Sequence, residues 1–266
     1  MKKALFLILT VALISSDAFG SDINFLTHSS EGQTYIDKSG ELRGEKHAGT
    51  RAFYVELVRE LMNRMKHSRK IVDVPFKRGF LIVQNKTNTA LFNVSRTSKR
   101  ENMFKWVGPI LIERDHFYEM KNSPTGIKNL EDAKKVKSIC VLNGSVHESV
   151  LRNNNFTNIC TNNEYVNCFK MLISGRVNLT PSAGVRTKQL IQEGFEVDQI
   201  QKTPVVLMET AGYIAFSKNI SDDIIQKWQT ALDEIKESYK YQQLYDHFVL
   251  FANDKGERIR VKGLHF

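Results

Sequence analysis

Apolar and polar residues alternate along this chain in two rhythms. Short runs rich in Val, Ile, Phe and Thr predict β-strands. Between them, apolar residues recur at helical spacing, first over residues 51–65 and again in the stretch that stops at Gly175. The strand-like runs are INFLT, RKIVDV, TALFNV, SICVL, FTNIC, VNLTP and GYIAF. Strands that alternate with helices predict an α/β fold with mainly parallel sheets.

Two long extended segments interrupt this alternation. They are GPILIERDHFYEMKNSPTG and KTPVVLMETAGYIAFSK. A chain that leaves one α/β lobe and later returns to it makes two such crossings. We therefore predict that residues 21–115 begin lobe I, residues 116–210 form lobe II, and residues 211–266 return to lobe I, where a last helix opens at Ser221.

The N-terminus predicts the compartment. Two lysines precede an apolar run over residues 4–14, and the small residues Ala18 and Gly20 follow in the positions of a cleavage site. A membrane anchor needs about 18 apolar residues, and this run is shorter. We therefore predict a secretory signal peptide over residues 1–20 and a soluble periplasmic product.

Charge and cysteine content narrow the class further. The net charge is +9, but no basic run is interleaved with aromatic residues, so we predict no nucleic-acid partner. In an oxidising compartment, the three cysteines Cys140, Cys160 and Cys168 predict one disulfide and one remaining thiol. Spacing does not settle the pair, and all three could instead be small buried apolar residues. We favour Cys140 with Cys168.

Sequence signatures of catalysis are missing. The stretch HESVL begins like a zinc-protease helix, but Leu151 stands where the second histidine would be needed, so His147 is expected on a helix surface. The chain contains no P-loop, no G-x-G-x-x-G, no G-x-S-x-G and no C-x-x-C. We predict no catalytic residue, no metal site and no cofactor.

A basic turn follows the apolar run TALFNV. The backbone from Asn93 to Thr97 is expected to emerge at the carboxyl edge of a sheet, where open α/β folds bind ligands. Ser95 and Thr97 offer hydroxyls, and Arg100 offers a planar fork of donors that suits a carboxylate. The alternative is a solvated turn whose basic side chains face water, which is the better interpretation of such a motif in isolation.

A second candidate corner lies in the stretch VLNGSVHESVL. Ser145 is followed three residues later by Glu148, which is a capping box, so a helix is expected to start just after Gly144. The amides at a helix N-terminus and its dipole favour an anion. The alternative is an ordinary cap. If both stretches face one cleft, the Arg100 guanidinium and the helix N-terminus at Ser145 would bind a small anion from opposite sides.

The third candidate is the stretch VPFKRGF. Phe76 follows a predicted strand and Pro75, so it is expected to begin a helix at the rim of the same sheet. An aromatic ring there can floor a ligand pocket or belong to the core. Arg78 can bind the ligand or pair with a neighbouring acid.

The order of these motifs resembles the family 3 extracellular solute-binding proteins, the periplasmic receptors that typically deliver polar amino acids to ABC importers. The resemblance spans nearly the whole mature chain. It is carried by GELRG, FYVELVRELM, VPFKR, TALFNVSRTSKRENMFKWVGP, NLEDAKKVKSICVLNGS, MLISGRVNLT and AGYIAFSKNISDDIIQKWQTAL. It implies a type II periplasmic-binding fold, with two mainly parallel sheets flanked by helices and two extended hinge strands between the lobes.

The resemblance also implies roles for single residues. Arg100 would grip a ligand carboxylate, Ser95 would add a hydroxyl or backbone contact, Gly144 and Ser145 would give backbone amides, and Phe76 would pack on the ligand. Family members usually carry an aspartate after the segment matching GRVNLT, where this chain reads Pro-Ser-Ala around Ser182. Ser182 is therefore a candidate ligand residue in its place.

These observations predict a monomeric periplasmic binding protein. It would close over a small anionic or zwitterionic solute by hinge motion and deliver it to the membrane subunits of an ABC importer. Two alternatives remain open. One is an exported enzyme on the same fold, such as a dehydratase, for which Glu209 or His28 would have to lie beside Arg100. The other is a ligand-sensing receptor for a membrane signalling partner.

Overall fold

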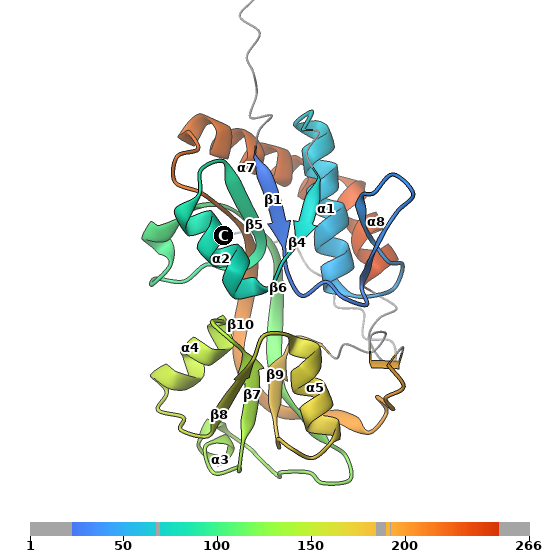
Figure 1. The fold of residues 1–266 in the computed structure, drawn as a ribbon, viewed down its shortest axis with the longest axis vertical. Helices are drawn as coiled ribbons and strands as arrows, with labels where there is room; N and C mark the ends of the chain where they lie inside the picture. Colours follow the sequence, from blue (N-terminus) through green and yellow to red (C-terminus); the bar gives the residue numbers. More distant parts are fainter. Residues whose placement is uncertain (1–22, 68–69, 185–189, 192, 250–266) are drawn as a thin grey trace, which may run out of the picture.

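The computed structural model describes residues 23–67, 70–184, 190–191 and 193–249 (Figure 1). The expected signal peptide, residues 1–20, lies outside the described residues. Across the part of the chain that is described, no helix is both long and apolar enough to cross a membrane.

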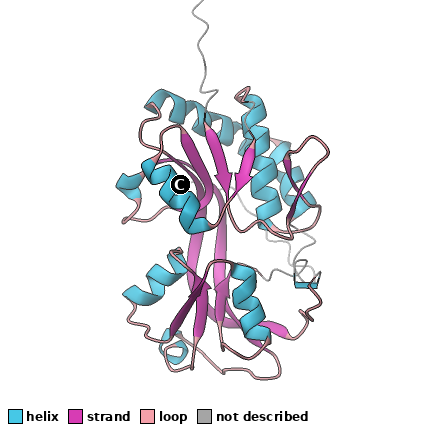
Figure 2. Cartoon of the chain, viewed as in Figure 1, coloured by secondary structure: helices cyan, strands magenta, loops and turns pink. Residues whose placement is uncertain are grey.

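Lobe I is built on the amino-terminal strands (Figures 1 and 2). Strand β1 (Asn24–Thr27) lies between β4 (Ile71–Asp73) and β5 (Thr89–Ser95), and all three are parallel. A small antiparallel hairpin pairs β2 (Thr34–Ile36) with β3 (Leu42–Gly44). The helical elements of this lobe are α1 (Thr50–Arg64), α2 (Phe76–Asn85), the short 3-10 helix η1 (Glu101–Met103), α7 (Asp222–Glu237) and α8 (Tyr239–Phe248).

Lobe II repeats the architecture on a smaller scale. Strand β7 (Ile139–Leu142) pairs in parallel with β8 (Ile159–Asn162). A single parallel bridge between Ile139 and Leu179 brings β7 beside the chain that enters β9 (Thr180–Ser182). Among the described residues, the helices of this lobe include α3 (Leu130–Ala133), α4 (Val146–Asn153) and α5 (Tyr165–Ile173).

Two long strands connect the lobes, as the ribbon in Figure 1 shows. Strand β6 (Lys105–Met120) leaves lobe I, and β10 (Ile200–Phe216) returns to it as the antiparallel partner of β6 and β5. The largest sheet therefore runs β4-β1-β5-β10-β6-β9. The predicted α/β, two-lobed fold is confirmed. The boundaries predicted at residues 115 and 210 fall inside these two strands and stay a prediction.

Separate apolar cores stabilise the two lobes. The core of lobe I packs α1, α7 and α8 on the sheet around fully buried side chains such as Phe53 and Trp228. Lobe II holds two smaller clusters, one around Phe117 and one around Phe169. A disulfide joins Cys140 of β7 to Cys168 of α5, which is the pair favoured from the sequence.

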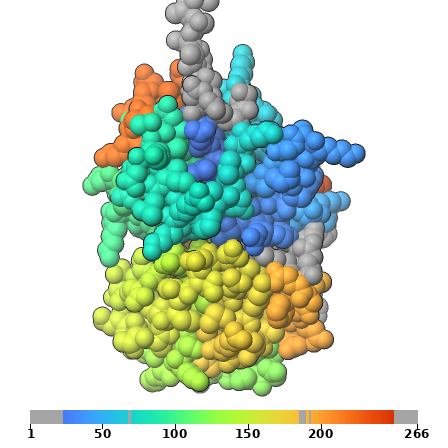
Figure 3. Space-filling view, viewed as in Figure 1, coloured from blue at the N-terminus to red at the C-terminus, as the bar shows by residue number. Residues whose placement is uncertain are grey.

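One further cluster spans both lobes, and we call it the interlobe cluster. It lies under α2 in lobe I and includes Leu142 and Tyr165 of lobe II. On the face shown in Figure 3, the atoms of the two lobes meet across the middle of the molecule. The structure thus presents the lobes in contact, which places the predicted ligand residues of lobe I close to those of lobe II.

Candidate functional site

The three basic side chains of the turn after β5 have different environments. Arg96 is half exposed and forms a two-pronged pair with Glu101, with N···O distances of 2.8 and 2.5 Å. Lys99 donates to the side-chain oxygen of Asn153 in α4 at 3.1 Å. Arg100 is only 8% exposed. The alternative of a solvated turn therefore holds for Arg96 and Lys99. Arg100, in contrast, points between the lobes.

Arg100 bridges the lobes through main-chain oxygens. Its Nη1 donates to the carbonyl of Ser95 and its Nη2 to the carbonyl of Gly144, both at 3.1 Å. Among the described residues no carboxylate forms an ion pair with it. A buried cation without an anionic partner loses the hydration that stabilised its charge. The site therefore holds an uncompensated positive charge, shielded from water.

Aromatic rings line the other side of this guanidinium. Its carbon lies 5.7 Å from the centroid of the Phe76 ring and 5.2 Å from that of Phe80. The His28 ring packs against the Phe76 ring at a tilt of 57°, with 4.7 Å between the ring centroids, and His28 Nε2 lies 3.0 Å from the carbonyl oxygen of Asn93. Burial lowers the pKa of Arg100 below its usual value, while the neighbouring Tyr165 acts in the opposite direction. Arginine keeps its charge even so, because its pKa ordinarily lies far above neutral pH.

Local sequence explains how this turn is built. Pro75 occupies the N-cap of α2, Phe76 is the first helical residue, and the Phe76 side chain is buried. Asn93 has a φ of 61°, opposite an irregular register in β10, which bends the end of β5. The carbonyl of Thr97 accepts from the amide of Arg100 at 2.9 Å and closes the turn.

The glycine–serine corner forms the cap expected from its sequence. Ser145 is the N-cap of α4, and its hydroxyl accepts from the amide of Glu148 at 3.2 Å. The amides expected to be free are not free in this conformation. The Gly144 amide donates to the Glu148 carboxylate at 2.7 Å, and the Ser145 amide donates to the carbonyl of Leu142 at 3.0 Å. The acid of the capping box has taken the place that the sequence suggested for a ligand anion.

Among the described residues, no hydrogen bond joins Arg100 to two other predicted site residues, Arg78 and Ser182. Arg78 is exposed on α2, and no ion pair joins it to a described residue. Ser182 ends β9, where it pairs with His116 of β6, and its hydroxyl donates to the carbonyl of Gly184 at 2.7 Å. The structure brings Phe76, Asn93, Ser95, Thr97, Arg100, Gly144 and Ser145 to one interlobe region.

A buried polar chain behind this region was missed from the sequence. His147 was expected on a helix surface, but it is 5% exposed, which corrects that expectation. Its Nδ1 lies 2.5 Å from the hydroxyl of Tyr165, and its Nε2 lies 3.2 Å from Asp115 Oδ2. Thr210 donates to the same carboxylate oxygen at 2.8 Å. These four polar side chains therefore link α4 and α5 to both hinge strands.

For the alternative of an exported enzyme, either His28 or Glu209 would have to lie beside Arg100. His28 packs against Phe76, one of the two rings that lie near the Arg100 guanidinium. Glu209 is exposed and pairs with Arg114 at 2.7 Å on the surface of the hinge. The described residues contain no group of three or more metal-ligating side chains arranged to hold a metal ion.

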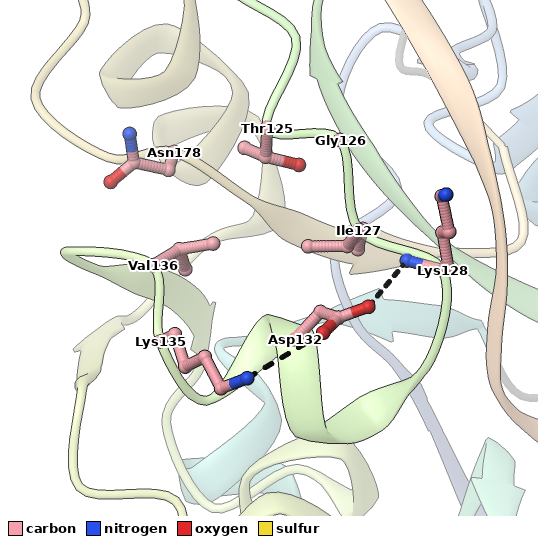
Figure 4. A pocket seen from close by; sticks show the side chains of 8 residues that line it. All are labelled: Thr125, Gly126, Ile127, Lys128, Asp132, Lys135, Val136 and Asn178. Carbon is pink, nitrogen blue, oxygen red and sulfur yellow. Dashed lines mark hydrogen bonds and ion pairs between the residues drawn. The ribbon is translucent and has the colours of Figure 1, made fainter.

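A hollow of about 580 Å³ lies in lobe II (Figure 4). Its lining includes Asp132, which forms an ion pair with Lys135 at 3.8 Å and accepts from the amide of Lys128 at 3.0 Å. No predicted site residue lines it. We therefore take the interlobe region around Arg100, rather than this hollow, as the candidate functional site.

Comparisons with known proteins agree with this fold. No family model matches the sequence, and no curated protein matches it either. Solved structures do match over most of their length. An arginine-binding protein from T. maritima shares 19% identity, covering 85% of this chain and 94% of its own, with a TM-score of 0.69.

Two further similar structures differ in role. A histidine kinase sensor domain with similarity to periplasmic binding proteins shares 14% identity, covering 84% of this chain and 93% of its own, with a TM-score of 0.68. An ancestral amino-acid-binding protein, described as a precursor of cyclohexadienyl dehydratase, shares 15% identity, covering 85% and 94%, with a TM-score of 0.66. At these identities the likeness establishes the fold, that of the two-lobed periplasmic binding proteins.

Proposed function

We propose that this protein is a family 3 solute-binding protein that captures a small anionic or zwitterionic, amino-acid-like solute. In this proposal residues 1–20 direct export to the periplasm, and the mature chain acts as a monomer. Lobe I (residues 21–115 and 211–266) and lobe II (residues 116–210) close over the solute, and the loaded protein docks on an ABC importer. The protein performs no chemistry on its solute.

The buried, acid-free guanidinium of Arg100 carries this proposal. Folding removes this charge from water, and among the described residues two main-chain carbonyls and two aromatic rings replace its hydration. An anionic group of the solute would supply the missing counter-charge. Arg96 lies in the same turn and is already neutralised by Glu101, so it offers a matched comparison.

Lobe closure follows from the same contacts. Arg100 of lobe I reaches Gly144 of lobe II, and Lys99 reaches Asn153. A solute anion that binds Arg100 would contact groups from both lobes, so its binding free energy would favour the closed form over the open form. Ser95, Asn93 and Thr97 would add backbone or side-chain contacts from lobe I.

The remaining candidates have supporting roles in the proposal. Phe76 would cover an apolar face of the solute, as its position against Arg100 suggests. The Gly144 and Ser145 amides would bind the anion only where it displaces their present partners, Glu148 and Leu142. Arg78 and Ser182 would contribute only to a solute long enough to reach them.

The test is calorimetric titration of the purified mature protein against single amino acids and small carboxylates. Truncating one partner of a buried charge pair typically lowers the binding free energy by about 2–5 kcal/mol. Because about 1.4 kcal/mol corresponds to a tenfold change in affinity, this is a loss of about 30-fold to several thousand-fold. Arg100→Met should show this loss, and Arg100→Lys an intermediate one. Arg96→Met should stay within about fivefold, because exposed ion pairs contribute at most about 1 kcal/mol.

Two outcomes would overturn the proposal. One is the lack of binding by native protein to any member of the panel, and the other is equal affinity in native protein and a folded Arg100→Met variant. Circular dichroism of each variant establishes that it is folded.

The likeness to the dehydratase precursor favours a second candidate, an exported enzyme on the same fold. It is distinguished by recovering the bound compound after prolonged incubation with stoichiometric protein. An unchanged compound supports the binding protein, and a converted one supports the enzyme.

A further inference from the structure

Positive charge is concentrated at the end of lobe II that lies away from lobe I. Residues 121–137 and Arg176 together hold six basic and two acidic residues, a net charge of +4 out of the +9 of the whole chain. Helix α3 of this segment lies at the far end of lobe II in Figure 1. We call the five exposed basic side chains the basic face, and they are Lys121, Lys128, Lys135, Lys137 and Arg176.

Strand pairing brings the ends of this segment to one edge of lobe II. Strands β6 and β9 are antiparallel, so Lys121, the residue after β6, lies at the edge where β9 begins. Strand β7 begins at the same edge, because Ile139 and Leu179 form a parallel bridge. Gly144 follows the opposite end of β7 and accepts from Arg100 in the interlobe region. The edge that carries Lys121 therefore faces away from the candidate solute site.

Hydrogen bonds of Ser138 fix the position of Arg176 beside the segment. The amide of Ser138 donates to Asn178 Oδ1 at 3.2 Å, and its hydroxyl donates to the carbonyl of Arg176 at 3.3 Å. Lys137 immediately precedes Ser138 in the chain. Lys137 and Arg176 thus lie on neighbouring parts of the backbone, although 38 residues separate Ser138 from Arg176 in sequence.

The hollow in lobe II joins two more basic residues to this edge. Figure 4 shows Lys128 and Lys135 on either side of Asp132, with Asn178 at the same hollow. Lys135 lies 3.8 Å from the Asp132 carboxylate and its side chain is 79% exposed, so the pair neutralises it only weakly. Lys128 contacts Asp132 through its backbone amide rather than its ammonium group.

Most of this positive charge is available to a partner. Across the described part of the chain, no ion pair involves Lys121, Lys128, Lys137 or Arg176. The sixth basic residue of the segment, Lys134, is paired with Glu131 at 2.5 Å and is not counted in the basic face.

The composition of the basic face favours a lipid surface over a protein. Protein interfaces are anchored by aromatic residues and arginine, and they are depleted of lysine. Four of the five side chains here are lysines, and no exposed large apolar residue of the described chain falls within residues 121–137 or 174–178. Clusters of about four to eight basic residues are typical of segments that bind anionic lipid. We propose that the basic face of lobe II holds the protein reversibly against an anionic phospholipid surface.

The strength of this association follows from its electrostatic origin. A basic residue close to an anionic bilayer strengthens binding by about fivefold. Three lysines together therefore contribute up to about 100-fold. The basic face offers no large apolar side chain to insert into the bilayer, so salt should release the protein, because the Debye length falls to about 3 Å at 1 M ionic strength.

The first measurement is cosedimentation of the mature protein with vesicles. We expect binding at low salt to vesicles of equal parts phosphatidylglycerol and phosphatidylcholine, and release by about 1 M salt. Vesicles of phosphatidylcholine alone should not bind. The proposal is overturned by a lack of binding to the mixed vesicles, by equal binding to both kinds, or by binding that persists at high salt.

The second measurement locates the contact. A variant with Lys128→Gln, Lys135→Gln and Lys137→Gln should bind the mixed vesicles at least about tenfold more weakly than native protein. Matching thermal melting curves establish that it is folded.

The matched control removes the same charge from lobe I. Lys66, Lys86 and Lys218 are exposed there, and their combined replacement by glutamine should change vesicle binding by less than about threefold. An equal loss in both triple variants would mean that the overall charge attracts the vesicles, and it would overturn the proposal.

Poly-L-glutamate tests for an acidic protein partner. Binding of this polymer through the same three lysines, without binding to the mixed vesicles, would assign the basic face to an acidic polypeptide and overturn the proposal.

This inference is independent of the proposed solute capture. Arg100 is buried, so Arg100→Met should bind the mixed vesicles as native protein does, whatever its affinity for a solute. Loss of vesicle binding in a folded Arg100→Met variant would place the lipid contact at the interlobe region and contradict the inference.

Discussion

A close approach between helix α1 and hinge strand β10 gives a prediction with an unusual sign. Tyr54 is fully buried, and among the described residues its hydroxyl has no hydrogen-bond partner. Burial raises the pKa of Tyr54 well above its usual value, so the group is a neutral phenol. Leaving a buried polar group unsatisfied costs about 1–3 kcal/mol. Tyr54→Phe should therefore stabilise the protein by about 1 kcal/mol or more.

Gly212 explains why the hydroxyl is so confined. It lies in β10 opposite Ser95 of β5 and Leu111 of β6. A Cβ at this position would overlap the Tyr54 hydroxyl oxygen and lie 2.7 Å from Cζ. Overpacking a tight site costs about 1–3 kcal/mol, so Gly212→Ala alone should destabilise by that amount.

The two changes should couple. Tyr54→Phe removes the atom nearest to the new methyl group, so Gly212→Ala should cost less in that background, with a coupling energy of about 1 kcal/mol. For a chain of this size, 1 kcal/mol corresponds to about 2–4 °C in Tm.

The assay is a double-mutant cycle by urea denaturation and scanning calorimetry. The described packing of α1 on the hinge would be wrong if the stability changes of the two substitutions were strictly additive. It would also be wrong if the Tyr54→Phe variant were less stable than the native protein. A lowered stability of Tyr54→Phe alone would indicate a hydrogen-bond partner for the hydroxyl.

Three further predictions concern stability and charge. Replacing both Cys140 and Cys168 by alanine should cost about 3–4 kcal/mol in urea denaturation, because the bond closes a loop with a sequence separation of 28; an unchanged midpoint would show that the thiols are not bonded. Ser145→Ala should lower the free energy of unfolding by about 1 kcal/mol, because α4 loses its N-cap hydrogen bond. A decrease of less than about 0.3 kcal/mol would contradict this prediction. The Ser39 hydroxyl holds the pKa of Asp37 down at about 2. The contribution of Asp37 to stability is therefore present above about pH 4 and lost toward pH 2; carboxyl NMR should show this midpoint rising in Ser39→Ala, and a native midpoint near 4 would refute the assignment.

The regular elements were predictable because their signals are local. Apolar periodicity placed a helix over residues 51–65, and the structure has α1 at Thr50–Arg64. The serine and acidic residues at Ser221 predicted the start of α7, whose cap is formed as expected. The hairpin of β2 and β3 was missed, because strands of three residues are too short to show an alternating pattern.

The site was predictable only in part. Arg96 and Arg100 look equivalent in sequence, yet Glu101 neutralises Arg96 while the backbone turn directs Arg100 inward. That difference depends on the turn geometry rather than on residue type. The burial of His147 had no local signal at all, because its contacts Asp115 and Tyr165 come from other elements and meet only after the lobes have folded.

The occupation of the amides at the glycine–serine corner could have been predicted more readily than the burial of His147. A capping box predicts that its acid reaches back toward the N-terminus of the helix. Here Glu148 reaches one residue further, to the amide of Gly144. A capping acid and a ligand anion compete for the same donors, so the motif that suggested the site also reduces its capacity.

The most direct test of the account compares two compounds that differ only in charge at one end. The tightest-binding carboxylate from the titration panel and its carboxamide analogue are each titrated into native protein and into Arg100→Met. If Arg100 is the counter-charge of the bound solute, native protein should prefer the carboxylate by about 30-fold or more, and the variant should bind both compounds about equally. Native protein that binds the carboxamide as tightly as the carboxylate would contradict the account.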